Sequence, residues 1–279
     1  MDRNQATGLL VISLMIMVYF YFFGGAPETP EQPKQATETV IKDKPTPQLQ
    51  EAPAVPDSVQ QLLNQLQFGS LADAAKGTEE FVTLENNDLR VVFSTKGGTV
   101  SEVELKNYKT YDKEPLILVT PQSSNQKLIA KENGKELNLF DLFYSVDQKE
   151  VNDTLQLTFT LTDGKGGYLK QHYSLPKGKG YLIGYQLETK GMSDLLAEGL
   201  TLDWKSNLIA TEKDANLSRN HTAVKYYQTD GEFDGLSERS SDLKTETINN
   251  LKWISFKQHF FTSAVIAEDE FASGVLSHE

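Results

Sequence analysis

The 279-residue chain contains no cysteine, which excludes a disulfide framework and any thiolate chemistry. Basic residues are scarce as well: 27 lysines and arginines stand against 39 aspartates and glutamates, giving a net charge of −12. Because the phosphate backbone of a nucleic acid selects for basic surfaces, this balance argues against a nucleic-acid partner. It argues equally against peripheral attachment to anionic lipid.

Catalytic motifs are also missing from the sequence. There is no phosphate-binding G-x-x-x-x-G-K-[ST] loop, no H-E-x-x-H zinc motif and no G-x-S-x-G nucleophile turn. The glycines between residues 178 and 184 have the wrong spacing for a dinucleotide loop and predict a hairpin turn. The four histidines are scattered without the spacing of metal ligands: His172, His221, His259 and His278. We therefore predict no catalytic residue, no metal ligand and no cofactor.

Only one long apolar run interrupts this polar chain, from Gly8 to Phe23. With its flanking residues it would form a helix of about 30 Å, long enough to cross the hydrocarbon core of a bilayer. It ends in an aromatic cluster at residues 19–23 and lacks a small-x-small cleavage site, so a retained anchor over residues 1–25 is favoured over a cleaved signal peptide. Arg3 precedes the run and acidic residues follow it, which predicts a cytoplasmic N-terminus and export of the rest.

Residues 26–56 are rich in Pro, Gln, Thr and Glu and poor in the apolar residues that a core needs, which predicts a disordered linker. A short amphipathic helix is predicted over residues 57–69, where Ser58 and Gln61 have the spacing of a capping box. Its apolar residues recur at i, i+3, i+4 and i+7: Val59, Leu62, Leu63 and Leu66. Packing of this stripe against the following domain is favoured over the binding of a partner.

From residue 80 to residue 279 the pattern changes from a helical to a strand period. Apolar and polar residues alternate in two runs, one at Leu155, Leu157, Phe159 and Leu161, the other at Tyr181, Ile183, Tyr185 and Leu187. Glycine-rich clusters such as residues 163–167 separate these runs and predict turns. Many short strands joined by glycine turns indicate one large antiparallel β-sandwich.

Four aromatic residues near the end of the chain form a possible contact surface: Trp253, Phe256, Phe260 and Phe261. Their spacing, near i, i+3, i+7 and i+8, favours a helical stripe, although Ile254 and residues 265–266 would fit a strand equally well. Packing in the core is the favoured interpretation. The alternative is a surface that contacts another membrane component or the segment that follows the domain.

Several segments together resemble the YidC membrane protein insertases of Gram-negative bacteria. The chain begins with M-D-R-N, continues into a single anchor that ends in aromatics, and then into a Pro/Gln-rich linker. The segment "TLENNDLRVVFSTKGGTVSEVELKNYKTY" and the later "YLIGYQLE" and "LKWISFKQHFFTSAVI" are similar to the large periplasmic domain of that family. The most specific pieces are the turn at residues 95–98 and the pattern of Trp253, Gln258, Phe260 and Phe261.

This resemblance implies a mainly β fold, an antiparallel β-supersandwich of the mutarotase-like type, preceded by one transmembrane helix and a disordered linker. It also implies a single-pass location in the cell inner membrane, with the bulk of the chain in the periplasm, and a role that is not enzymatic. The implied partners are the inner membrane, nascent membrane proteins and the Sec translocon including SecDF.

In this family, insertion is carried out by further transmembrane helices. Because the chain ends at Glu279 without a second hydrophobic span, we expect the insertase core to be missing from it. The alternative function is a membrane-anchored periplasmic sandwich that binds or epimerises a carbohydrate. That reaction would need a general base and a general acid converging in one cleft.

Overall fold

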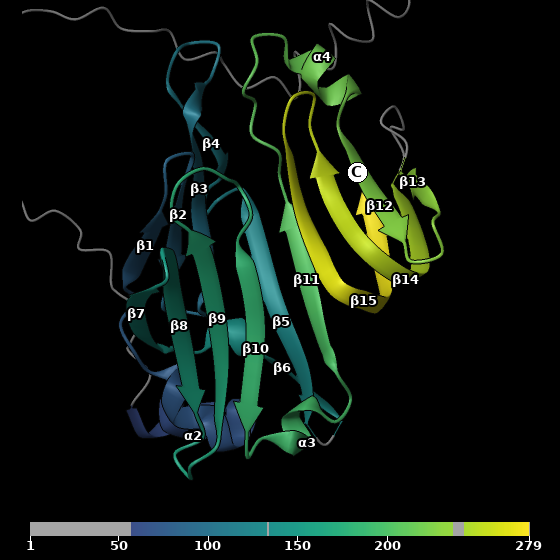
Figure 1. The fold of residues 1–279 in the computed structure, drawn as a ribbon. Coiled ribbons are helices and arrows are strands. Elements are labelled where there is room, and N and C mark those ends of the chain that lie inside the picture. The colour runs from purple at the N-terminus through teal and green to yellow at the C-terminus, as the bar shows by residue number, and fades with distance from the viewer. Residues whose placement is uncertain (1–56, 133, 237–242, 279) are drawn as a thin grey trace, which may run out of the picture. The chain divides into compact units, whose positions relative to one another are not determined.

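The computed structural model describes residues 57–132, 134–236 and 243–278 of the chain (Figure 1). The predicted anchor and linker, residues 1–25 and 26–56, lie outside the described residues. Within the part that is described, every helix is too short or too polar to cross a bilayer.

The described chain begins with helix α2 (Asp57–Phe68), followed by the 3₁₀ helix η1 (Gly69–Ala75). On α2 only Asn64 and Phe68 are buried, and Phe68 joins the main core. The apolar stripe that was expected to pack against the domain is exposed instead, at Val59, Leu62, Leu63 and Leu66. That expectation is wrong because the helix contacts the sandwich through its C-terminal end and through η1, not through the face that carries the leucines.

Two four-stranded antiparallel sheets pack face to face around the main core. The first has the order β1-β2-β3-β4 and consists of β1 (Phe81–Glu85), β2 (Leu89–Ser94), β3 (Thr99–Lys109) and β4 (Pro115–Val119). The second has the order β10-β9-β8-β7 and consists of β7 (Ser145–Val151), β8 (Thr154–Thr162), β9 (Tyr168–Pro176) and β10 (Gly184–Lys190). The alternation of apolar and polar residues in β8 is confirmed, since Leu157, Phe159 and Leu161 are buried.

A third, three-stranded sheet extends this core in the order β11-β5-β6. It consists of β5 (Ser124–Glu132), β6 (Lys135–Asn138) and β11 (Leu200–Ser206), with the short helices η2 (Leu139–Asp141) and α3 (Ser193–Leu196) beside it. Apolar residues of all three sheets belong to one cluster, in which the ring centroids of Phe93 and Tyr173 are 4.6 Å apart. The ring of Phe159 meets Tyr173 edge-on at 6.0 Å.

The fourth sheet has the order β13-β12-β14-β15 and its own small core. It consists of β12 (Ala223–Gln228), β13 (Phe233–Gly235), β14 (Lys244–Lys257) and β15 (Thr262–His278), and the short helix α4 (Ala215–Asn220) precedes it. In Figure 1 this sheet lies beside β11. Taken together, the four sheets confirm the predicted antiparallel β-sandwich.

The turn at residues 95–98, which carries the family resemblance, is tied directly into the main core. Gly97 and Gly98 both have positive φ angles, of +82° and +58°, which favour glycine. A Cβ atom on Gly98 would lie 2.9 Å from the Cβ atom of Phe159. The Gly98 carbonyl accepts a hydrogen bond from the Tyr173 hydroxyl at 2.9 Å, and the Gly97 carbonyl accepts one from buried Gln171 at 2.7 Å. The turn is therefore a structural connection between the two main sheets.

Candidate functional site

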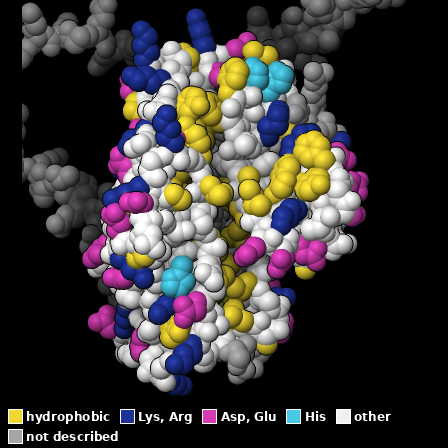
Figure 2. Space-filling model, in the orientation of Figure 1, with side chains coloured by type: hydrophobic (Ala, Val, Ile, Leu, Met, Phe, Trp, Pro, Cys, Tyr) yellow, Lys and Arg dark blue, Asp and Glu magenta, His cyan; other side chains and the backbone are white. Residues whose placement is uncertain are grey.

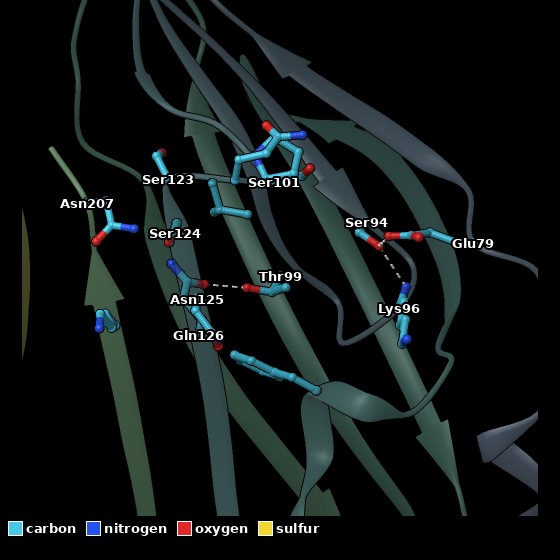
Figure 3. Close-up of a pocket in the computed structure, with 15 residues that line it drawn as sticks. Glu79, Ser94, Lys96, Thr99, Ser101, Ser123, Ser124, Asn125, Gln126 and Asn207 are labelled. Carbon is cyan, nitrogen blue, oxygen red and sulfur yellow. Dashed lines mark hydrogen bonds between the residues drawn. The ribbon is translucent and has the colours of Figure 1, made fainter. Parts of the chain in front are cut away.

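A polar cleft of about 640 Å³ opens between β3 and β5 (Figure 3). It is assembled from segments that are far apart in the sequence, and its wall includes Ser94, Lys96, Thr99, Gln126, Lys205 and Asn207. Thr99 on β3 donates a hydrogen bond to Gln126 on β5 across the floor of the cleft. No sequence motif predicts this site, because its lining residues come from separate segments around residues 79, 94–101, 121–126, 140 and 205–207.

The groups in the cleft suit the binding of a polar ligand. Hydroxyls and side-chain amides supply both donors and acceptors, and Lys96 and Lys205 add positive charge. Glu79 is the only carboxylate among the lining residues, and it accepts a hydrogen bond from the Ser94 hydroxyl at 2.6 Å. No histidine lines the cleft. The titratable groups of the lining are thus one carboxylate, Glu79, and two lysines.

The histidines, which look scattered in the sequence, are partly brought together in the structure. His259 Nδ1 lies 2.9 Å from Glu212 Oε2, and the His259 ring stacks on His221 with centroids 4.3 Å apart. On the outer face of the second sheet, His172 Nε2 lies 3.0 Å from Glu188 Oε2. Among the described residues, no group of three or more side chains that could hold a metal is formed.

The His172 pair lies on a partly exposed strand surface outside the polar cleft. The Tyr168 hydroxyl donates a 2.6 Å hydrogen bond to Glu188, and this bond, together with the one from His172, lowers the pKa of Glu188 below its usual range. A carboxylate held in its charged form in this way is a weak general base, so the pair resembles a surface ion pair more than a catalytic dyad.

The four aromatic residues predicted near the end of the chain do not form a helical stripe. Trp253 and Phe256 lie on β14, where an odd spacing places them on opposite faces of the sheet. Trp253 stacks on Tyr227 at 6.1 Å, whereas Phe256 packs on the core of the fourth sheet. The helical pattern is wrong because β14 pairs with both β12 and β15 along this stretch.

Phe260 and Phe261 occupy the turn between β14 and β15. Phe261 packs against the main core and meets Tyr108 edge-on at 5.4 Å. Phe260 is 68% exposed and stacks on the neighbouring His259 ring, at 4.1 Å. The structure thus separates the four residues into three that contact apolar surroundings within the domain and one that points outward.

Comparison with known proteins identifies the chain. Residues 81–277 match the YidC periplasmic domain family over most of the chain. The chain belongs to this family. The resemblance drawn from the turn at residues 95–98 and the segment around Trp253 is therefore confirmed.

Relatives named membrane protein insertase YidC match nearly the whole chain. The protein of Cytophaga hutchinsonii is 34% identical over 264 residues, which is 94% of this chain and 42% of that protein. The protein of Amoebophilus asiaticus is 33% identical, covering 98% of this chain and 46% of that protein. The protein of Parabacteroides distasonis is 29% identical, covering 99% and 46%. The chain thus spans less than half the length of these YidC relatives.

Proposed function

We propose that this chain provides the membrane anchor and periplasmic domain of a YidC-type insertase, which assists the insertion and folding of inner-membrane proteins. The observation that carries the proposal is the near-complete coverage of the chain by relatives that bear the insertase name. In this proposal residues 1–25 cross the inner membrane, residues 26–56 form a linker, and the sandwich lies in the periplasm. Insertion itself belongs to parts of the insertase outside this chain.

The domain acts in this proposal as an interaction module and not as an enzyme. Its polar cleft, with amide, hydroxyl and lysine groups, suits reversible contact with a polar segment of another protein. The carbohydrate alternative receives less support, because the histidine pairs lie outside that cleft. The proposed partners are nascent membrane proteins and the Sec translocon including SecDF, and the inner membrane is the site of action.

Site-specific crosslinking tests this proposal in living cells. Because the chain has no cysteine, a photoreactive probe can be attached to a single introduced cysteine at Asn207, in the cleft, or at Phe260. We expect crosslinks to membrane proteins under synthesis or to Sec components. A matched probe at exposed Val151 is the control. Equal yields at all three positions, or none, would contradict the proposal.

The membrane anchor has a separate test. We expect the protein to stay in the membrane pellet after alkaline carbonate extraction, and the sandwich to be cleaved by protease only when the outer side of the inner membrane is exposed. A chain recovered in the soluble fraction with a new N-terminus near Ala26 would show that the apolar run is a cleaved signal peptide.

A further inference from the structure

An exposed aromatic surface lies at the end of the molecule opposite helix α2. We call it the aromatic loop end, and it consists of Tyr108, Tyr111, Tyr181, Leu182 and Phe260. Tyr108 lies near the end of β3, and the others come from the β3–β4 connection, the β9–β10 connection and the β14–β15 turn, which all lie toward the upper end of the molecule in Figure 1. Figure 2 shows hydrophobic side chains gathered at this end beside histidine and lysine or arginine side chains.

Contacts between these three connections make the surface continuous. Tyr108 meets Phe261 edge-on at 5.4 Å, which joins the end of β3 to the β14–β15 turn. Tyr181 approaches Tyr108 from the β9–β10 connection, and partial burial together with their hydrogen bond raises the pKa of Tyr181. The backbone N–H of Tyr111 donates to the carbonyl of Thr211 at 3.2 Å.

The β9–β10 connection is held in a fixed position although it is not part of a strand. The sequence pattern predicted that a strand begins near Tyr181, but β10 begins only at Gly184. The preceding backbone is anchored by the Asp88 carboxylate, which accepts a hydrogen bond from the Gly180 N–H at 2.7 Å, and by the Asn86 amide, which donates to the Gly180 carbonyl at 3.0 Å. Leu182, which is 71% exposed, is therefore presented outward on a fixed segment.

The charge at this end differs from the average of the chain. Exposed lysines lie on these segments at Lys109, Lys113 and Lys179, and Lys213 follows Thr211, whose carbonyl pairs with Tyr111. Asp112, Glu114, Glu212 and Asp214 lie on the same segments and balance these lysines, so the local charge is close to neutral, whereas the whole chain has a net charge of −12. Because charges separated by more than about 8 Å are screened at physiological salt, the local balance decides what this surface can approach.

The residue types favour a bilayer surface over a protein groove. Tyrosine and phenylalanine prefer the boundary between headgroups and acyl chains, and lysines around them contact lipid phosphates. A second exposed apolar surface, the stripe of leucines on α2, has aliphatic residues among glutamines and no basic residue on the helix, and it lacks both properties.

We propose that the aromatic loop end docks reversibly on the surface of an anionic bilayer, with Tyr111, Leu182 and Phe260 entering the headgroup region. The inference rests on the proposed anchoring of the chain in a membrane. In the proposed function residues 26–56 connect the domain to the anchor, which keeps it close enough to the bilayer for weak contacts to matter. The negative charge of the whole chain is spread over surfaces that do not contact the lipid. It therefore does not argue against docking through this end.

Lipid quenching in reconstituted discs tests the docking. The full chain is placed in nanodiscs of phosphatidylcholine and phosphatidylglycerol that carry nitroxide-labelled lipids, and a fluorophore is attached through Leu182→Cys. The matched control reporter is Leu66→Cys on α2, which is 65% exposed at the opposite end. We expect quenching at position 182 to exceed that at position 66 at least about threefold. Equal quenching at the two positions would overturn the proposal.

Two variants identify which groups are responsible. With the reporter at position 182, the double variant Tyr111→Ser/Phe260→Ser should reduce quenching to the level seen at position 66, whereas Phe233→Ser, an equally exposed aromatic elsewhere, should leave it unchanged. Discs without phosphatidylglycerol should reduce quenching about twofold.

Quenching that survives the double variant, or that is not reduced in neutral discs, contradicts the proposal. A chain that fails to enter the discs refutes the anchor and the docking together, whereas a chain that enters without quenching refutes the docking alone.

Discussion

The main core and the core of the fourth sheet are built very differently. In the first, strands of three sheets and the turn at residues 95–98 enclose a continuous cluster that includes the fully buried Phe93 and Phe159. The buried residues of the second, within the described part of the chain, are Val224, Tyr226, Leu236, Leu251 and Leu276, while the same sheet leaves apolar residues of β15 exposed. Since hydrophobic stabilisation follows the apolar area removed from water, the first region must supply most of the stability.

This difference in packing distinguishes the part of the domain that maintains the fold from the parts that are free to make contacts. A tightly packed core tolerates little change, whereas loops and partly covered strands can open locally at low cost. The polar cleft and the aromatic loop end are both formed by strand ends and the connections next to them. The comparison therefore predicts that substitutions in the main core affect folding, and that substitutions at the margins affect contacts.

The largest effect we expect is alkaline unfolding of the main core. Burial raises the pKa of Tyr144 and Tyr173 well above the ordinary value of 10.0, and their hydroxyls donate to the carbonyls of Leu139 and Gly98 at 3.2 and 2.9 Å. Because the folded state holds these protons more tightly, stability is complete below pH 10 and falls as the pH rises above it. By pH 12 the loss should be about 3 kcal/mol for each tyrosine.

Urea unfolding curves recorded by circular dichroism between pH 8 and pH 12 measure this loss. The variant Tyr173→Phe removes one ionisable group and should show a smaller decrease above pH 10. Stability that stays constant from pH 9 to pH 12 would show that these hydroxyls are not buried as the structure places them.

The next largest effect is expected for Phe159→Ala in the main core. The side chain is fully buried between Phe93 and Tyr173, so its removal leaves a cavity that the packed rings cannot close. We expect a loss of about 3–5 kcal/mol in the free energy of unfolding, measured by urea titration. The control Phe233→Ala, at a residue that is 60% exposed, should lose less than about 1 kcal/mol. Similar losses in both variants would contradict the comparison.

A smaller effect is expected for Phe256→Ala in the fourth sheet, about 1–3 kcal/mol. Phe256 packs on the small core and meets Trp204 edge-on at 4.6 Å. Trp253 lies in this sheet, and Trp204 on β11 contacts it through Phe256, so tryptophan fluorescence reports on this region while circular dichroism reports on all strands. We expect the variant to move the fluorescence midpoint in urea more than the dichroism midpoint. Coincident midpoints would mean that the two cores unfold as one unit.

The smallest effect is expected for Phe260→Ala, within about 0.5 kcal/mol of the parent protein, because the side chain is mostly exposed. Its neighbour Phe261 packs against the main core and Tyr108, and Phe261→Ala should cost about 1–3 kcal/mol. Thermal unfolding of the two variants measures the difference. Equal losses would show that Phe260 is covered, and would remove one of the contacts on which the docking surface depends.

The fold could be predicted from the sequence in strands where every second residue faces the core. In β8, alternating residues face the main core, so a period of two is visible in the sequence from Leu155 to Leu161. The same reasoning failed between Trp253 and Phe261. This stretch is the end of a strand with a register shift after Leu251, followed by a turn, and its aromatic residues have a spacing that resembles a helical one. It also failed on α2, because amphipathic spacing indicates a helix but not what covers its apolar face.

By itself, the sequence determined the family, the antiparallel β class and the absence of cysteine chemistry, since these depend on composition, on local periodicity and on motifs such as the turn at residues 95–98. Only the tertiary structure decided which residues meet in the polar cleft, which histidines pair with carboxylates, and which aromatics remain exposed at the aromatic loop end. Each of these features joins segments tens of residues apart, and local spacing carries no information on how such segments approach one another once the sheets have packed.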